Sequence, residues 1–169
     1  VRRTLVDLYG EEKLYEGGLS VRTTLDPRLQ DIAERAFKDA LIAYDRRHGW
    51  RGPVARIETL TDWGVELEKI DPPAGMHDWE LAVVLEAGAT EAAIGLLGGD
   101  EAITPFEELS WAREPLEDAA VGPAPNQASD VLTPGDVILV EALDEERARF
   151  GLRQVPEAQG GLIAIDPRT

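Results

Sequence analysis

The sequence predicts an α+β fold, in which a long amphipathic helix near the N-terminus precedes a small antiparallel β-barrel of about five strands. Three observations predict it. Apolar residues recur at helical spacing after Asp26. From residue 54 onwards they come instead in short runs separated by glycine and proline, which is typical of strands. A double glycine, an apolar run and an Asp-Pro pair occur twice, at 17–27 and at 160–167.

The N-terminal part is predicted to be mainly helical. Residues 2–9 predict a helix that ends before Gly10, and residues 19–24 predict a strand. The next helix is the clearest element, because Asp26 suits the N-cap and Pro27 the first helical position. Its apolar stripe consists of Leu29, Ile32, Ala33, Ala36, Phe37, Ala40, Leu41 and Tyr44. Since burial is what stabilises such a stripe, we expect this helix to pack on another part of the protein.

Two interpretations fit the basic segment 46–51 at the end of this helix, which reads Arg-Arg-His-Gly-Trp-Arg. It could bind an anion or a nucleic acid, with Trp50 as the stacking platform. It could also be a helix end that docks on a neighbouring part of the protein. We favour docking, because Gly49 can adopt the left-handed cap and the acidic residues that follow can pair with the arginines.

The barrel is predicted from short apolar runs. The predicted strands are 54–57, 80–85, 92–97, 137–143 and 150–155. Residues 87–90 predict a hairpin connection between the second and third of these, and Gly95 predicts a bulge or a tight bend. Thr104 to Glu107 have the pattern of a capping box, which predicts a short helix towards Leu109.

The remaining segments are less regular. Residues 60–69 predict another helix, although a glycine weakens the pattern, and the prolines of 117–134 predict a mobile loop. We interpret Trp63, Trp79 and Trp111 as core residues rather than as ligand platforms. Strands at 19–24 and 161–165 need partners for their backbone groups, so they are expected to pair with each other or with strands beyond the sequence. The region between them is therefore interpreted as an insertion into a larger sheet.

Charge is unevenly distributed along the chain, whose net charge is −16 at pH 7. Residues 1–56 sum to +2 and residues 57–169 to −18. Such an acidic surface favours solubility and repels phosphate backbones and anionic headgroups, so we expect no nucleic acid and no membrane contact for this segment. No run approaches the ~20 apolar residues that span a bilayer, and we expect any membrane anchor to lie outside this sequence. The lack of cysteine excludes disulfides and thiolate metal ligands.

The sequence predicts no catalytic, cofactor-binding or metal-ligating residue. Acidic pairs occur at 107–108, 117–118 and 145–146, but adjacent residues point apart and pairs arise by chance in a chain this acidic. His48 and His77 are far apart in sequence and have no cysteines beside them, so a metal site is not expected. No cofactor is expected either.

Several segments resemble those of a known family. Residues 9–11, 14–19, 23–26, 29–30 and 33–34 are similar to the segment after the glycosyltransferase domain of class A penicillin-binding proteins. Residues 44–53 resemble the 1A type of that family. Residues 132–138 are similar to a strand of its inserted OB-like domain, and residues 161–167 to the strand that opens the main part of its transpeptidase domain.

The resemblance implies three parts. Residues 1–53 would be a linker and the first strand-helix unit of the transpeptidase scaffold, residues 54–155 an OB-like inserted domain, and residues 156–169 the opening strand of the transpeptidase domain. The parent it implies is a bifunctional enzyme, anchored in the inner membrane and working in the periplasm. That enzyme polymerises glycan from lipid II and cross-links stem peptides during cell-wall synthesis.

The catalytic motifs of that family do not occur in this sequence. A penicilloyl serine transferase needs Ser-x-x-Lys, but Ser20, Ser110 and Ser129 are followed three residues later by threonine, arginine and leucine. The glycosyltransferase's Glu-Asp motif with its downstream histidine is missing as well. We therefore expect this segment not to be an enzyme, although the parent would be one.

The sequence thus predicts a non-catalytic regulatory or docking segment of a bifunctional peptidoglycan synthase. The resemblance implies as partners the neighbouring transpeptidase domain of the same chain and an outer-membrane lipoprotein activator or another envelope protein. A free-standing OB-like module that binds nucleic acid or glycan is the alternative, and an enzyme in its own right is a third hypothesis.

Overall fold

The computed structural model describes residues 2–76 and 78–166. His77 and residues 167–169, the last part of the predicted opening strand, lie outside the described residues. The chain divides into two compact units, Val1–Arg35 and Ala36–Thr169, which are described separately below. The division into 1–53, 54–155 and 156–169 stays a prediction.

The first unit is helical. Helices α1 (Arg2–Tyr9) and α2 (Glu11–Glu16) are separated by Gly10, whose φ is +80°. The Arg2 guanidinium Nε donates to the hydroxyl of Tyr15 at 2.9 Å, which links the two helices. The predicted helix over 2–9 is confirmed, whereas α2 was not predicted. Residues 19–24, expected to form a strand, are coil because no described strand pairs with them.

Helix α3 (Pro27–Arg46) begins in the first unit and ends in the second, and it confirms the prediction of a long helix. Oδ1 of Asp26 accepts a hydrogen bond from the backbone N–H of Arg28 at 2.9 Å, as expected of an N-cap. The apolar stripe is not uniformly covered. Leu29, Ile32 and Tyr44 are 64%, 54% and 47% exposed, while Phe37 and Leu41 are half-buried. Ile42, which the predicted stripe did not include, packs on a core of the second unit.

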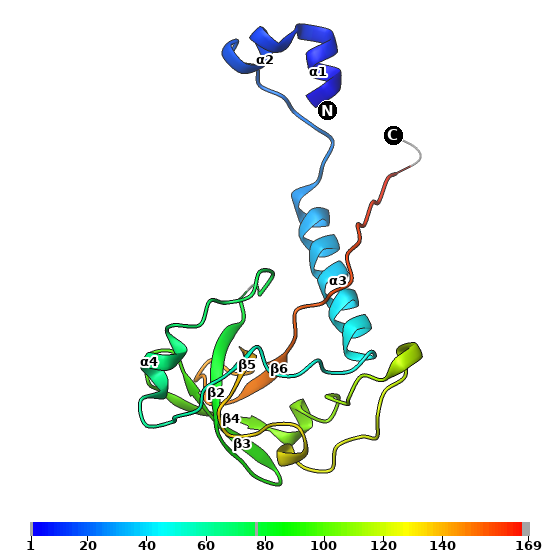
Figure 1. The fold of residues 1–169 in the computed structure, drawn as a ribbon. Helices are drawn as coiled ribbons and strands as arrows, with labels where there is room; N and C mark the ends of the chain where they lie inside the picture. The colour runs from blue at the N-terminus through cyan, green and yellow to red at the C-terminus, as the bar shows by residue number, and fades with distance from the viewer. Residues whose placement is uncertain (1, 77, 167–169) are drawn as a thin grey trace. The chain divides into compact units, whose positions relative to one another are not determined.

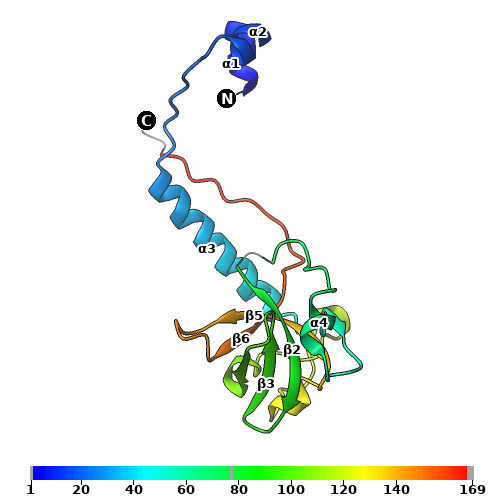
Figure 2. The same cartoon turned by 90° about the vertical axis from the view of Figure 1, so that its left-hand side faces the viewer.

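The second unit contains one antiparallel sheet, seen in Figures 1 and 2. Its strands are β1 (Ala55–Arg56), β2 (Glu80–Ala87), β3 (Glu91–Leu96), β4 (Glu101–Pro105), β5 (Asp136–Ala142) and β6 (Phe150–Arg153). The order is β1-β5-β2-β3-β4, and β6 also pairs with β5. Strands β1 and β6 thus share one edge of β5, where Ala55 pairs with Val137 and Arg153 with Leu139. We call this sheet and its surrounding loops the body.

The antiparallel sheet is confirmed, but the predicted barrel is not closed by a continuous ladder. Strand β4 meets the chain just before β6 at an isolated parallel bridge between Ile103 and Arg149, and Ile103 N–H donates to the Ala148 carbonyl at 3.0 Å. The Asp144 carboxylate accepts from the Ala148 N–H at 2.9 Å and holds this segment in a turn. Because of this turn, the extended segment before β6 is too short to form a continuous ladder of hydrogen bonds with β4.

Both faces of the sheet are buried. The first core cluster contains Ala82, Val84, Ala92, Ile94, Leu96, Ala102, Leu109, Ala112, Ala128, Leu132, Ile138, Val140, Phe150 and Leu152. The second contains Ile57, Leu67, Trp79, Leu81, Val83, Val137 and Leu139. Alternate residues of β2 and β5 therefore enter opposite cores, which explains why both strands are continuous apolar runs in the sequence.

Short helix α4 (Trp63–Leu67) covers the second core and confirms part of the helix predicted over 60–69. Trp63 packs against this core, Trp79 belongs to it, and Trp111 packs against the first core, so the interpretation of all three as core residues is confirmed. Of the two alternatives predicted at Gly95, the bulge is wrong, because Gly95 pairs in register with Val83 and Glu101, and the tight bend stays a prediction. The register shift lies in β2, between Val84 and Glu86.

One local prediction in this region needs correction and one is confirmed. Thr104 is fully buried at the end of β4 rather than an N-cap, because the 3₁₀ turn η1 (Phe106–Glu108) begins after Pro105 without a side-chain cap. The capping-box pattern is misleading here because Thr104 and Pro105 are the last residues of β4, a strand that the sequence did not predict. The hairpin through 87–90 is confirmed by the pairing of Ala87 with Ala92.

The segment 117–134 was expected to be a mobile loop, yet its second half is packed. It contains the 3₁₀ turns η2 (Glu117–Ala119) and η3 (Ala128–Asp130). Ala128 and Leu132 belong to the first core. Oδ2 of Asp130 accepts from the backbone N–H groups of Asn126 at 2.8 Å and Gln127 at 3.2 Å. These hydrogen bonds, the one from Asn126 foremost, lower the pKa of Asp130.

Candidate functional site

Three segments of the second unit meet where the chain enters and leaves the body: the end of α3, residues 50–54, and residues 153–157. Beyond residue 157 the chain passes the C-terminal half of α3, where Gly160 lies against the ring of Phe37. The polar side chains at the meeting point are those of Asp45, Arg51, Gln154 and Glu157. We call these four residues the crossing.

Asp45 is the centre of the crossing and is only 4% exposed. Arg51 donates to it from both ends of its guanidinium, Nη1 to Oδ1 at 2.9 Å and Nη2 to Oδ2 at 3.2 Å. The Gln154 amide Nε2 donates to Oδ2 at 2.7 Å, and the Glu157 backbone N–H donates to Oδ1 at 3.3 Å. Each carboxylate oxygen thus has two donors, which compensates the loss of water around a buried charge.

The partners of Asp45 also bind one another. The Arg51 backbone N–H donates to Gln154 Oε1 at 2.7 Å, and its Nη2 donates to the Val155 carbonyl at 2.6 Å. Arg51 Nε lies 3.3 Å from Glu157 Oε1. The Gln154 amide reaches the Gly49 carbonyl as well, at 3.1 Å. Segments more than a hundred residues apart in sequence are thereby fixed side by side.

Gly49 makes the chain path into the crossing possible. Its φ is +92°, as predicted for a left-handed helix cap. A Cβ at this position would lie 2.6 Å from the Arg113 carbonyl oxygen, which accepts a hydrogen bond from the Trp50 N–H at 2.8 Å. Only glycine therefore lets the backbone turn and approach residue 113 this closely.

Two further arginines, Arg153 and Arg46, lie next in sequence to members of the crossing. Arg153 donates from Nε to Glu141 at 2.7 Å and from Nη1 to Glu108 at 3.1 Å. The Arg46 guanidinium lies 4.9 Å from the centre of the Trp111 ring. Burial, and then the positive charge of Arg153, lower the pKa of Arg46. Arg46 is thus engaged with the body, as expected of a docked helix end, whereas Arg47 is exposed and its guanidinium lies 5.7 Å from the centre of the Tyr44 ring in the same helix.

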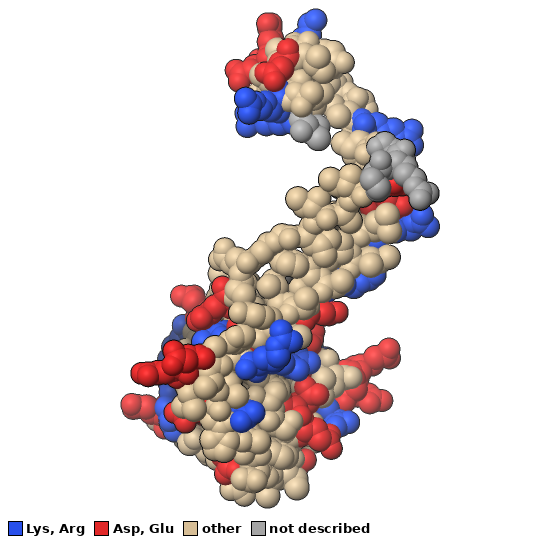
Figure 3. Space-filling model, turned by 90° about the vertical axis from the view of Figure 1, so that its right-hand side faces the viewer, with Lys and Arg blue, Asp and Glu red and all other residues tan. Residues whose placement is uncertain are grey.

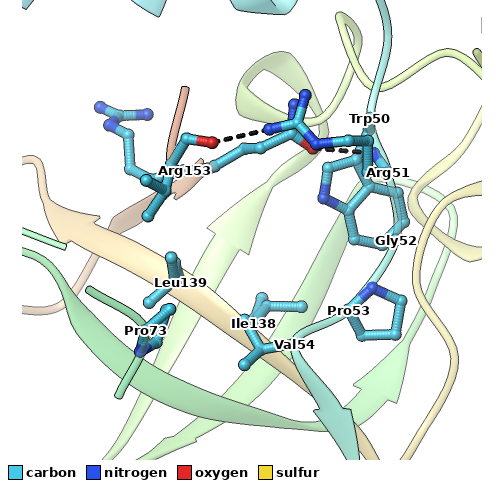
Figure 4. A pocket seen from close by; sticks show the side chains of 11 residues that line it. Trp50, Arg51, Gly52, Pro53, Val54, Pro73, Ile138, Leu139 and Arg153 are labelled. Atoms are coloured by element: carbon cyan, nitrogen blue, oxygen red, sulfur yellow. Dashed lines mark hydrogen bonds between the residues drawn. The ribbon is translucent and has the colours of Figure 1, made fainter. Parts of the chain in front are cut away.

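An apolar hollow of about 260 Å³ opens between the start of β1 and the end of β6. It is lined by Trp50, Arg51, Gly52, Pro53, Val54, Pro73, Ile138, Leu139, Arg153, Gln154 and Val155. Figure 4 shows Arg51 on one side of the hollow and the β5 residues Ile138 and Leu139 on another. Two of its lining residues, Arg51 and Gln154, are also members of the crossing.

A wider, polar hollow of about 520 Å³ lies beside β1 and α4. Its cations are already paired: Lys69 lies 2.7 Å from Glu66, and Arg56 lies 3.6 Å from Asp136. The hollow therefore does not concentrate charge of one sign on a ligand.

The acidic pairs noted in the sequence do not come together as acid and base. Glu107 lies 3.7 Å from Arg149, whereas its neighbour Glu108 pairs with Arg153. The residues at 117–118 and 145–146 are exposed. Within residues 2–76 and 78–166 no three His, Asp or Glu side chains are arranged to hold a metal ion. Across the same residues, the helices are too short or too polar to traverse a bilayer.

Of the residues the structure brings together, the sequence indicated only the basic segment 46–51. It gave no sign that Asp45, Gln154 and Glu157 act together, because no local spacing relates residues more than a hundred positions apart. Asp45 resembled any acidic residue on a solvated helix face until its burial was known.

Comparison with known proteins gives consistent results. The family model described as the penicillin-binding protein OB-like domain matches residues 50–158. Penicillin-binding protein 1A of Rickettsia typhi is 37% identical over 162 residues, which cover 96% of this chain and 19% of the relative. Penicillin-binding protein 1A of Pseudomonas aeruginosa is 34% identical over 169 residues, covering 99% of this chain and 20% of the relative.

Among solved structures, penicillin-binding protein 1A from Haemophilus influenzae superposes with a TM-score of 0.53 at 24% sequence identity. The match covers 92% of this chain and 21% of the other, and it supports the fold. The chain spans about a fifth of the length of the curated relatives it matches.

Proposed function

The chain belongs to the penicillin-binding protein OB-like domain family, and we propose on this premise that it is a non-catalytic docking and regulatory segment of a peptidoglycan synthase. The parent would polymerise glycan from lipid II and cross-link stem peptides in a penicillin-sensitive reaction. It would be anchored in the inner membrane, with this segment in the periplasm. The curated relatives are penicillin-binding protein 1A sequences, which supports this assignment.

The observation that supports an inserted docking domain most directly is the geometry of the crossing. The chain enters the body through residues 50–54 and leaves it through residues 153–157, and the Arg51 N–H donates to Gln154 across the gap at 2.7 Å. Entry and exit that lie together allow a domain to be inserted without separating the segments on either side. A free-standing module has no such requirement.

The polar side chains of the body support a role without chemistry. The carboxylates of Glu108 and Glu141 are paired with Arg153, and that of Asp45 with Arg51. These ion pairs give each carboxylate a structural role that needs no chemistry to explain it. We therefore assign both reactions to other parts of the parent.

Charge indicates what kind of partner the body can bind. Residues 57–169 sum to −18, and on the face in Figure 3 a group of basic side chains lies between acidic ones. Complementary charge would attract a protein with a basic surface and repel nucleic acid. The partners we propose are the transpeptidase domain of the same parent and an envelope protein such as an outer-membrane lipoprotein activator.

A competition experiment tests this function. The 169-residue chain is titrated into full-length synthase whose rate has been raised by its purified activating envelope protein. We expect the chain to lower the stimulated rate towards the basal rate and to leave the basal rate unchanged. Loss of the effect in high salt is expected as well, because the chain is acidic. An unchanged stimulated rate at saturating chain would contradict the docking role.

Two further measurements distinguish the other hypotheses. Labelled penicillin is incubated with the chain alone, and a stoichiometric covalent adduct would show that the chain is an enzyme in its own right. Fluorescent single-stranded DNA and soluble glycan strands are titrated with the chain at low and at physiological salt. Tight binding of either would favour the alternative of a free-standing OB-like module.

A further inference from the structure

Asp45 is the single buried residue of α3, which is otherwise an exposed or half-buried helix. We infer that the crossing is a latch: Asp45 joins the end of α3, residues 50–54 and residues 153–157 into one cooperative element that opens and closes as a whole. The latch would therefore control how the end of α3 is attached to the body. The inference does not depend on what the parent protein synthesises.

The contacts that hold α3 to the body are of two kinds, half-buried and fully buried. Its C-terminal half in the second unit contacts the body through half-buried side chains: Ile42 packs on the second core, and Lys38 lies 5.6 Å from the centre of the Trp79 ring. Neither side chain is fully buried. Arg46 also contacts the body, at the Trp111 ring, so Asp45 is distinguished by being the most enclosed side chain of this attachment.

The hydrogen bonds among Asp45, Arg51 and Gln154 form a closed ring. Arg51 and Gln154 both bind Asp45, and they also bind each other. Loss of Arg51 or Gln154 leaves the buried Asp45 carboxylate short of a donor, which is costly because only Asp45 is shielded from water. Groups connected in this way couple strongly, so that breaking one contact weakens the rest.

Two residues of the latch also reach the surface, at the apolar hollow. Arg51 and Gln154 line the apolar hollow, and Figure 4 shows Arg51 hydrogen-bonded to its neighbours at the rim. The same two side chains therefore line the hollow and hold Asp45. The end of α3 and the hollow become two ends of one coupled system.

Hydrogen exchange of backbone amides, followed by mass spectrometry on the 169-residue chain, tests the inference. Asp45→Asn places an amide nitrogen where donors from Arg51 and Gln154 need an acceptor. We expect exchange in peptides covering 42–46 and 154–157 to accelerate together by about tenfold or more, while β2 and β5 keep their protection. Asp39→Asn is the matched control, because Asp39 is an exposed acidic residue of the same helix.

Two further variants sharpen the test. Arg51→Lys keeps the charge but cannot donate to both carboxylate oxygens at once, so we expect the pattern of Asp45→Asn. Gln154→Ala removes one donor, so we expect the same peptides to accelerate by a smaller factor, and this variant serves if Asp45→Asn fails to fold. Acceleration of 42–46 alone, no acceleration, or equal acceleration in every strand would each overturn the latch.

Discussion

Gly95 of β3 lies against the indole ring of Trp63, so closely that a Cβ on residue 95 would be 2.7 Å from ring carbons. The ring belongs to α4 and packs against the second core. A glycine in the middle of a strand is unfavourable by itself, and here it is explained by the space that the tryptophan needs. The sheet and the helix that covers it are thus fitted to each other at one position.

Gly95→Ala is predicted to destabilise the chain by about 1–3 kcal/mol, because the new methyl group has to displace a packed ring. Urea unfolding measures the effect. Gly64→Ala is the matched control: Gly64 lies in α4 with no heavy atom near its Cβ position, so alanine there should be neutral or slightly stabilising. Equal effects of the two variants would contradict the packing argument.

Gly49→Ala is predicted to be more harmful than Gly52→Ala. Both residues have positive φ, +92° and +97°, so alanine is strained by about 1–2 kcal/mol at either position. Only at Gly49 does the added Cβ also meet backbone, at 2.6 Å from the Arg113 carbonyl oxygen. Urea midpoints for the two variants separate the clash from the strain. Identical losses would contradict the prediction, because they would show that the backbone at residue 113 shifts to accommodate the new Cβ.

Arg153→Met is predicted to cost about 1–3 kcal/mol of unfolding free energy, because it leaves Glu108 and Glu141 without their shared cation. Adding Glu108→Gln to this variant should recover part of the loss. Arg147→Met is the control, since its pair with Glu80 is more exposed and should contribute less than about 1 kcal/mol. A double-mutant cycle by urea unfolding gives the coupling, and a coupling near zero would contradict the pairing.

Asp130 is predicted to make stability depend on pH. Its pKa is lowered in the folded chain, so its contribution is fully present above the unfolded pKa of about 3.9 and is lost as pH falls through the lower folded value. Asp130→Asn should therefore differ from the parent chain at pH 7 and converge with it in strong acid. Urea midpoints measured from pH 7 down to about pH 3 check that the difference begins to narrow below the unfolded pKa, and a constant difference would rule out the carboxylate as its source.

The sequence predicted the elements whose pattern is local. Helix α3 could be predicted from its N-cap and apolar period, and β2, β3 and β5 from apolar runs bounded by turn residues. Strand β4 was missed because Glu101–Pro105 is short, half polar and ends in proline. The strands expected at 19–24 and 161–165 are coil, because strand propensity does not stabilise a segment that has no partner.

The candidate site was less predictable than the fold. Helix capping identified Gly49, and charge indicated that the nearby arginines pair with acidic residues. Tertiary structure determines which acidic residues pair with these arginines. Arg51, for example, pairs with Asp45, six residues earlier, and with Glu157, more than a hundred residues later. The hollow depends on the gap between β1 and β6, and a gap between two strand ends has no sequence signature.

The arrangement of β1 and β6 end to end along β5 has a consequence for how this protein can diverge. Both connections leave from one margin of the sheet, so we expect the residues between them, here called the cassette, to tolerate change without displacing the flanking segments. Loops distant from that margin can lengthen, shorten or reverse their polarity over generations while the spacing of the flanking segments stays constant. Relatives should accordingly differ most in the interior of the cassette and least where its two stems meet.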